Sequence, residues 1–269
     1  MPAAQPPAVP PAFEVRRPGY DFGGNDTGHH THGTGFIVAK DFLHNVLRYD
    51  AVSDRISVLR IRGQFANISL VNVYAPTELA VDETKDQFYE QLELIYDQLP
   101  SYDIKIVLGD FNAKIGREDI YVPTIGTHSK HTHSNDNGLR LISFASAKAM
   151  VVKSTMFPHK DIYKGTWRSP DGYTINQIDH VAIDERHKRT IEDVRTFRGA
   201  DCDSDHYLLG IKLKFRIKSV KKHSQTAEDR IDIDNLKSQN MKETFQLELS
   251  NRFKDLDIND PIDTVWENI

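Results

Sequence analysis

Ile104-Lys105-Ile106-Val107-Leu108-Gly109-Asp110-Phe111-Asn112 is the stretch of sequence that decides the fold of this chain. Its first five residues are mostly apolar, which predicts a short buried β-strand that leads directly to Asp110. Asp110 and Asn112 are two residues apart, so both side chains point to the same side if the backbone stays extended. A second stretch, Ser204-Asp205-His206, places a carboxylate next to an imidazole at the start of another apolar strand. Neither stretch is informative alone, because Asp and Asn also favour turns.

The surrounding sequence predicts an α/β protein. Strands are expected at 55–62, 68–74, 104–108, 178–183, 191–197 and 209–215. Phe88, Leu92, Ile95 and Leu99 recur at helical spacing and predict an amphipathic helix at 84–99, with Thr84 and Gln87 as a capping box. A second helix is expected at 137–149. Strands and helices alternate only loosely, which favours a layered α/β sandwich over a parallel Rossmann sheet.

The composition narrows the class of protein. The 269 residues carry a net charge of -5, which argues against a purely electrostatic nucleic-acid binder. The only cysteine, Cys202, excludes an internal disulfide framework and favours an intracellular location, in the nucleus or cytoplasm. No apolar run reaches the roughly 18 residues of a membrane span. We therefore expect no membrane partner. Neither GxGxxG nor GxxxxGK[ST] follows a strand, so we also expect no nucleotide cofactor.

Three regions are expected along the chain. Residues 1–18 form a Pro-rich, disordered start, and residues 19–218 form one α/β domain. Residues 219–269 form a linker and a helical segment, in which Phe245, Leu249 and Phe253 share one face. The histidines at 29, 30, 32, 128, 131 and 133 have no cysteine beside them and lie in loop-like sequence. We expect them to be solvated loop histidines, not zinc ligands.

Four segments carry polar residues suited to one site: 72–76, 109–112, 176–180 and 204–206. Hydrolysis of a phosphodiester requires a carboxylate to take a proton from water, an amide to hold an oxygen, and a histidine to meet the phosphate. Structural alternatives stay open at this point. Tyr74 is a common strand residue, Trp167 suits a core, and Glu14 suits a solvated tail.

The segments resemble the endonuclease/exonuclease/phosphatase superfamily. The stretches that carry the resemblance are NVYAPTE (72–78), VLGDFNAKIG (107–116), FPHKDIYKGTWRSPDG (157–172), NQIDHVAI (176–183) and RGADCDSDHYLL (198–209). They are most similar to the endonuclease domain of RTE-type non-LTR retrotransposons and to craniofacial development protein 2-like proteins. The resemblance spans about 19–218 and implies a DNase I-like, two-layered β-sandwich flanked by helices.

The resemblance also implies roles for individual residues. It assigns Asp110 as the general base, Asn112 as a ligand to a phosphate oxygen, and Tyr74 as a donor to a phosphate oxygen. It assigns His206 to stabilise charge on the phosphate, with Asp179 orienting its ring. These five residues form the expected catalytic group.

A divalent cation is also implied, with Mg²⁺ or Mn²⁺ expected because the ligands are oxygen atoms. Asp205 and Glu14 are the expected metal ligands, and Trp167 is expected to lie against nucleic acid. Members of the superfamily open with a strand that carries an Asn, and this strand is missing here. We therefore expect an N-terminally truncated sandwich that lacks its first strand or strands, with reduced activity.

The predicted function is metal-dependent hydrolysis of phosphodiester bonds in DNA by a retrotransposon-derived endonuclease, with DNA as the partner. Two alternatives stay open: a non-catalytic remnant of a retrotransposon polyprotein, and a phosphatase of the same superfamily. The sequence does not predict an oligomeric state.

Overall fold

A computed structural model of the chain describes residues 33–200, 204–217 and 238–254. The chain divides into two compact units, residues 1–219 and residues 220–269. In the second unit, the helix α3 spans Gln239–Lys254 and contains the helical segment that the sequence predicted. The Pro-rich start and Glu14 lie outside the described residues. No helix in the described part of the chain is both long and apolar enough to cross a membrane.

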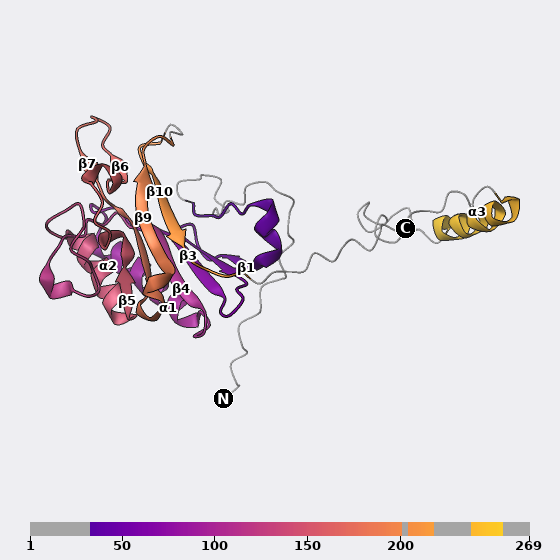
Figure 1. Ribbon diagram of the computed structural model, residues 1–269, viewed down its shortest axis with the longest axis horizontal. Coiled ribbons are helices and arrows are strands. Elements are labelled where there is room, and N and C mark those ends of the chain that lie inside the picture. The colour runs from indigo at the N-terminus through magenta and orange to yellow at the C-terminus, as the bar shows by residue number, and fades with distance from the viewer. Residues whose placement is uncertain (1–32, 201–203, 218–237, 255–269) are drawn as a thin grey trace. The chain divides into compact units, whose positions relative to one another are not determined.

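A mixed sheet organises the first unit (Figure 1). Within the described residues its six strands lie in the order β1 (Val46–Ala51), β2 (Ile56–Ile61), β3 (Ile68–Tyr74), β4 (Ile104–Asp110), β8 (Asp179–Asp184) and β5 (Met150–Val152). The pair β3 and β4 is parallel, and every other neighbouring pair is antiparallel. A parallel pair needs a long crossover, which α1 (Asp82–Gln98) provides.

Within the described residues of this unit, two helices, a two-stranded ribbon and a short hairpin lie outside this sheet. The helix α2 (Asp136–Ala147) contacts α1 and β5, and β9 (Ile191–Phe197) pairs with β10 (Leu208–Leu213) as a separate antiparallel ribbon. A short hairpin joins β6 (Trp167–Arg168) to β7 (Ile175–Asn176). The described 3₁₀ turns are Lys40–Asn45, Asp119–Tyr121, Lys153–Thr155, Asp161–Tyr163 and Glu185–Thr190.

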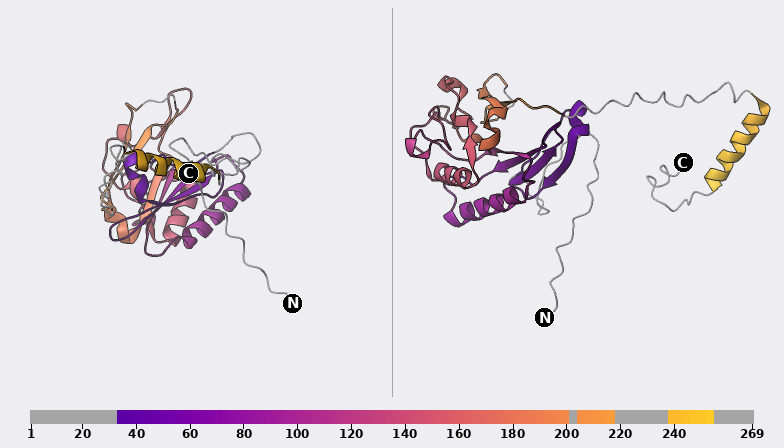
Figure 2. Two further views of the ribbon diagram at one scale, coloured as in Figure 1. Left: turned by 90° about the vertical axis from the view of Figure 1, so that its right-hand side faces the viewer. Right: turned by 60° about the horizontal axis from the view of Figure 1, so that its bottom comes forward.

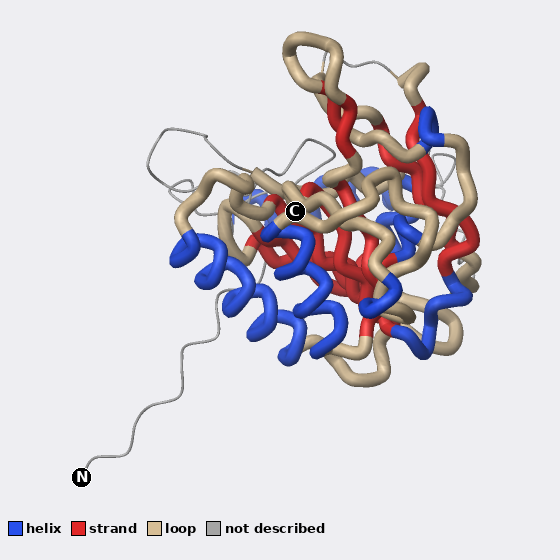
Figure 3. The backbone as a smooth tube through the Cα atoms, turned by 90° about the vertical axis from the view of Figure 1, so that its left-hand side faces the viewer, coloured by secondary structure: helices blue, strands red, loops and turns tan. Residues whose placement is uncertain are grey.

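Two apolar clusters lie on opposite faces of the sheet. Strand residues alternate between faces, so Val107 of β4 packs with the α1 and α2 side chains, while its neighbour Ile106 packs in the cluster that contains β9 residues. Figure 2 shows α1 lying along one face of the strands, and Figure 3 shows α1 and α2 side by side on that face. The unit is therefore layered as helices, central sheet and ribbon, which confirms the α/β class with a multistranded sheet flanked by helices.

The predicted amphipathic helix is confirmed, but its capping box is wrong. Phe88, Leu92 and Ile95 are buried on the inner face of α1. The helix begins at Asp82, before Thr84, and its N-cap Val81 makes no side-chain hydrogen bond. The acidic pair at 82–83 occupies the first turn, where negative charge is stabilised by the helix dipole. This electrostatic start allows the helix to begin two residues before the predicted cap.

The edge strand β1 was not predicted. Its residues are intermediate or exposed, and a half-buried edge strand gives only a weak alternation signal in the sequence. The strands predicted at 55–62 and 68–74 coincide closely with β2 and β3.

Candidate active site

Three neighbouring strands bring their polar residues to one edge of the central sheet. In the register of the sheet, Tyr74 of β3 lies opposite Asp110 of β4, and Asp110 lies opposite Asp179 of β8. Gly109, at φ 137°, makes this close pairing possible, because a Cβ there would lie 2.1 Å from the carbonyl oxygen of Val73. The register alone therefore aligns three of the predicted site residues.

His206 completes the cluster from a different part of the chain. Its backbone forms an isolated bridge with Trp167, and the amide of Tyr207 donates to the carbonyl oxygen of Thr166 at 2.7 Å. The ring Nδ1 lies 3.1 Å from Asp179 Oδ2, and the ring Nε2 lies 3.9 Å from Asp110 Oδ2. A carboxylate only accepts, so Nδ1 carries the proton that it donates to Asp179.

The environment shifts the pKa of two of these groups in ways that suit acid–base chemistry. Burial and the nearby carboxylate of Asp179 raise the pKa of Asp110 to about 6. The hydrogen bond to Asp179 raises the pKa of His206 above its usual value. A carboxylate with a pKa near 6 accepts a proton more readily than an ordinary one, and a stabilised imidazolium presents positive charge to an anion.

The Asp110 carboxyl is expected to titrate near pH 6 in the metal-free protein. Replacing Asp179 by Asn removes a like charge, so the Asp110 midpoint should move to lower pH. Side-chain ¹³C chemical shifts of labelled aspartate, followed from pH 3 to 8 in about ten steps, measure the Asp110 midpoint in the wild type and in the variant. A midpoint that does not move in Asp179→Asn contradicts this electrostatic coupling.

Asn112 sits in a left-handed backbone conformation, at φ 49°. Asparagine tolerates this region better than most residues. Its backbone amide donates to Asp110 Oδ1 at 2.8 Å, and its side-chain Nδ2 donates to the carbonyl oxygen of Ala75 at 2.9 Å. The turn therefore holds the Asn112 amide group beside the Asp110 carboxylate, from which Nδ2 is 3.4 Å distant.

Asp205 and Trp167 lie together at the exposed side of this cluster. The indole Nε1 donates to Asp205 Oδ2 at 2.8 Å, and the backbone amide of Arg168 donates to the Asp205 carbonyl oxygen. Trp167 is partly buried. Its indole thus orients a carboxylate, a contact that spacing in the sequence did not reveal.

The described residues provide only part of a metal site. No group of three or more His, Cys, Asp or Glu within 33–200, 204–217 and 238–254 could hold a metal ion. Asp205 and Asp110 are oxygen ligands of the kind that Mg²⁺ prefers, and one Asp205 oxygen already accepts from Trp167. Glu14, the other expected ligand, lies outside the described residues.

Two histidines have structural roles that the sequence did not predict. His131, expected to be a solvated loop residue, is half-buried and accepts from the backbone amide of Gln177, and burial lowers its pKa to about 4. His180 is fully buried and lies next to Asp179. Its Nε2 donates to the carbonyl oxygen of Ala113 at 2.8 Å, so its Nδ1 accepts from the Ser154 hydroxyl. In the sequence, the only signal for His180 was its position in the stretch NQIDHVAI, next to Asp179.

Comparisons with known proteins agree with the motifs. No family model matches the sequence. Craniofacial development protein 2 of Bos taurus is 33% identical over 192 residues, which is 71% of this chain and 32% of that protein. The homologue of Tragulus javanicus is also 33% identical over 192 residues, 33% of its length. The chain thus spans about a third of the length of the curated relatives that it matches.

Solved structures match the chain only in part and at low sequence identity. The endonuclease domain of TRAS1, a telomere-specific non-LTR retrotransposon, has a TM-score of 0.48 and 17% identity, covering 66% of this chain and 72% of that one. The 3′ phosphatase NExo from Neisseria, bound to a product DNA hairpin, has a TM-score of 0.45 and 19% identity, covering 61% and 66%. Over 192 of its residues, this chain is therefore similar in sequence to about a third of craniofacial development protein 2.

Proposed function

We propose that this chain hydrolyses phosphodiester bonds in DNA, using a divalent metal ion, Mg²⁺ or Mn²⁺. The observation that carries the proposal is the meeting of Asp110, Asp179 and His206 at one edge of the sheet, with contacts of 3.1 and 3.9 Å to the imidazole. These groups come from three separate segments, and each is partly accessible to solvent. Structural turn residues have no need to converge in this way.

In the proposed reaction, Asp110 takes the proton from the attacking water. Its raised pKa and its shielded position suit this role, and the backbone amide of Asn112 holds one of its oxygens in place. Water attacks phosphorus in line with the leaving oxygen, so one P–O bond forms as another breaks. The leaving 3′ oxygen takes up a proton from solvent, so the product is a nick with a 3′ hydroxyl on one side and a 5′ phosphate on the other.

His206 stabilises the charge that develops on the phosphate. Asp179 fixes the imidazole through Nδ1, so that Nε2 stays on the side of Asp110. The Asn112 amide and the Tyr74 hydroxyl supply further donors to phosphate oxygens in this scheme. Preorganised donors of this kind cost no reorganisation during the reaction.

Asp205 would hold the metal ion together with a ligand such as Glu14. When bound, the ion supplies charge neutralisation at the phosphate. Trp167 keeps the Asp205 carboxylate oriented through its indole nitrogen, and its partly exposed ring face is available to a base or sugar of the DNA.

Nicking of supercoiled plasmid is the direct test. With Mg²⁺ present, the wild-type chain should convert supercoiled to open-circular DNA, and chelation by EDTA should stop the reaction. Release of phosphate from a 3′-phosphorylated oligonucleotide without nicking would support the phosphatase alternative instead. Neither reaction, in the presence of Mg²⁺ or Mn²⁺, would support a non-catalytic remnant.

A further inference from the structure

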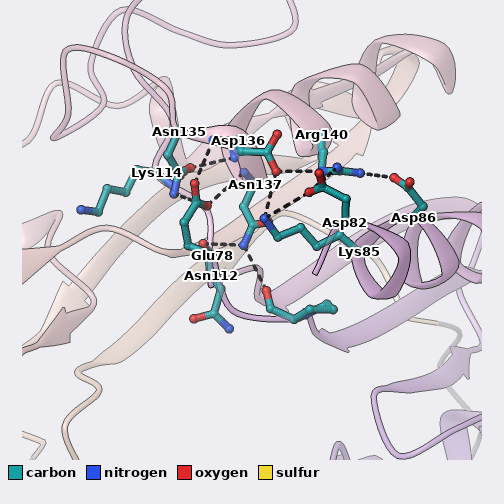
Figure 4. A network of polar contacts seen from close by, with 12 residues as sticks. Glu78, Asp82, Lys85, Asp86, Asn112, Lys114, Asn135, Asp136, Asn137 and Arg140 are labelled. Atoms are coloured by element: carbon teal, nitrogen blue, oxygen red, sulfur yellow. Dashed lines mark hydrogen bonds and ion pairs between the residues drawn. The ribbon is translucent and has the colours of Figure 1, made fainter. Parts of the chain in front are cut away.

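The start of α2 touches both loops that carry the candidate site. We name the segment 75–78, which follows β3, the β3 loop, and the segment 111–116, which follows β4, the β4 loop. Asn137 lies on the first turn of α2 and is 2% exposed. Its side-chain Nδ2 donates to the carbonyl oxygen of Pro76 and to that of Asn112, at 3.0 Å each (Figure 4). One buried amide therefore bonds to the backbone of both loops.

The β3 loop in turn fixes the backbone of Asn137. The Glu78 carboxylate accepts from the backbone amides of Asp136 and Asn137, at 3.2 Å each, and from Asn135 Nδ2 at 2.7 Å. The first amides of a helix have no partner within the helix, and negative charge is favoured there. Glu78 therefore satisfies the start of α2 and sets the direction in which Asn137 projects (Figure 4).

The β4 loop is attached to the same helix start at a second point. Asn135, the N-cap of α2, accepts from the backbone amide of Lys114 at 2.8 Å, and its own amide donates to the Lys114 carbonyl oxygen at 3.0 Å. The same side-chain oxygen caps the helix through the amide of Gly138. A Cβ on Gly138 would lie 2.1 Å from the Lys114 carbonyl oxygen, so glycine allows this approach.

These contacts surround Asn112. Its carbonyl oxygen is held by Asn137, and its side-chain amide is directed by the β3 loop through Ala75. An unfavourable positive φ persists only where neighbouring contacts hold it. We propose that Asn137 is a positioning residue that locks the β3 and β4 loops together and so holds the Asn112 amide beside Asp110. This inference rests on the proposed function, in which Asn112 contacts the phosphate.

The variant Asn137→Asp separates positioning from helix stability. Aspartate has nearly the same size, but its carboxylate would be buried beside Glu78 and Asp136, which disfavours the charged form. Far-UV circular dichroism and the melting temperature of the variant therefore have to show that α2 is retained. A carboxylate cannot donate, so both bonds to the loops are lost. In plasmid nicking we expect kcat to fall roughly 10- to 100-fold with little change in KM, because a group displaced from its reactive position lowers the rate by about this factor.

A double-mutant cycle shows whether the effect passes through Asn112. In an Asn112→Ala background, adding Asn137→Asp should produce almost no further loss of kcat. Arg140→Ala is the matched control on the same helix, because the hydrogen bonds of the Arg140 side chain within the described residues go to Asp82, Asp86 and Asp136 and to neither loop. It should lower the melting temperature without lowering kcat. Fully additive losses, or equal effects of Asn137→Asp and Arg140→Ala on kcat, overturn the proposal.

Amide hydrogen exchange keeps the inference separate from the proposed function. If the wild-type chain does not nick DNA, the proposed function fails, and exchange decides the positioning role alone. The Asn112 and Lys114 amides, bonded to Asp110 and Asn135, should exchange about tenfold faster or more in Asn137→Asp. The amides of β4 should be unchanged. Unaltered exchange at Asn112 and Lys114 shows that Asn137 does not hold the loop.

Discussion

Asp110→Asn is expected to abolish DNA nicking and, at neutral pH, to make the fold more stable. The variant keeps the shape of the side chain but cannot take a proton from water, which should reduce kcat by roughly 10²- to 10⁴-fold. Its amide oxygen can still accept from the backbone amide of Asn112, as the carboxylate does at 2.8 Å. The loss of activity would therefore reflect chemistry and not a collapsed loop.

The gain in stability follows from the raised pKa of Asp110. Burial and Asp179 raise this pKa from 3.8 to about 6, so between these pH values the folded state binds more protons than the unfolded state. The free energy of unfolding therefore falls as the pH rises through this window, and above it the charged side chain costs up to about 3 kcal/mol. A neutral Asn removes this cost at pH 7 and removes the pH dependence with it.

Urea unfolding at pH 4 and pH 7 measures the stability effect, and the plasmid assay measures the rate. The variant should gain stability over wild type at pH 7 and little or nothing at pH 4. Asp119→Asn, in an exposed turn, is the control and should leave both quantities unchanged. If Asp110→Asn nicks DNA at the wild-type rate, Asp110 is not the general base. If the stability of the variant at pH 7 equals that of wild type, the raised pKa of Asp110 is contradicted.

His206→Ala has the second largest expected effect. The proposed reaction places positive charge from this imidazole at the phosphate, and loss of one such stabilising group costs about 3 kcal/mol, or roughly 10²-fold or more in kcat. The fold should persist, because the backbone bridge to Trp167 does not need the side chain. His133→Ala, in an exposed loop position, is the matched control.

The His206 variant also tests the coupling between the three groups. In Asp179→Asn the imidazole loses the partner that raises its pKa, so kcat should fall. The fall should be smaller than in His206→Ala, because the imidazole itself is still present. Adding Asp179→Asn to His206→Ala should cost less than Asp179→Asn costs alone, since the part of its effect that passes through the ring is already lost and only its effect on Asp110 is left. Single-turnover nicking at saturating DNA gives these rates. Retention of wild-type kcat in His206→Ala is incompatible with the proposed role.

Much of the fold could be predicted because its strongest signals are local. The apolar period of 88, 92 and 95 predicts the inner face of α1, and the apolar run before Gly109 predicts β4. The capping box failed, because two acidic residues began the helix earlier than Thr84. The edge strand β1 was missed, since a strand with one open edge and mixed burial lacks a clear pattern.

The candidate site was predictable only as a set of residue types. Motifs indicated Asp110, Asp179 and His206, but no spacing along the chain reveals a contact of 3.1 Å between Asp179 and His206. The roles of Asn137 and Glu78 were not predicted, because each acts on a backbone carbonyl or amide far away in sequence. Such partners are chosen by where loops meet and leave no periodic signal.

The sequence by itself determined the apolar segments that must be buried, the relatives that share its motifs, and the polar groups available for chemistry. Side-chain chemistry and hydrophobic period are properties of short stretches, so they can be read locally. The tertiary structure alone decided that strand register sets Asp110 against Asp179, that the bridge to Trp167 brings in His206, and that the start of α2 joins the two loops. These depend on packing between distant segments, which also desolvates Asp110 and thereby raises its pKa.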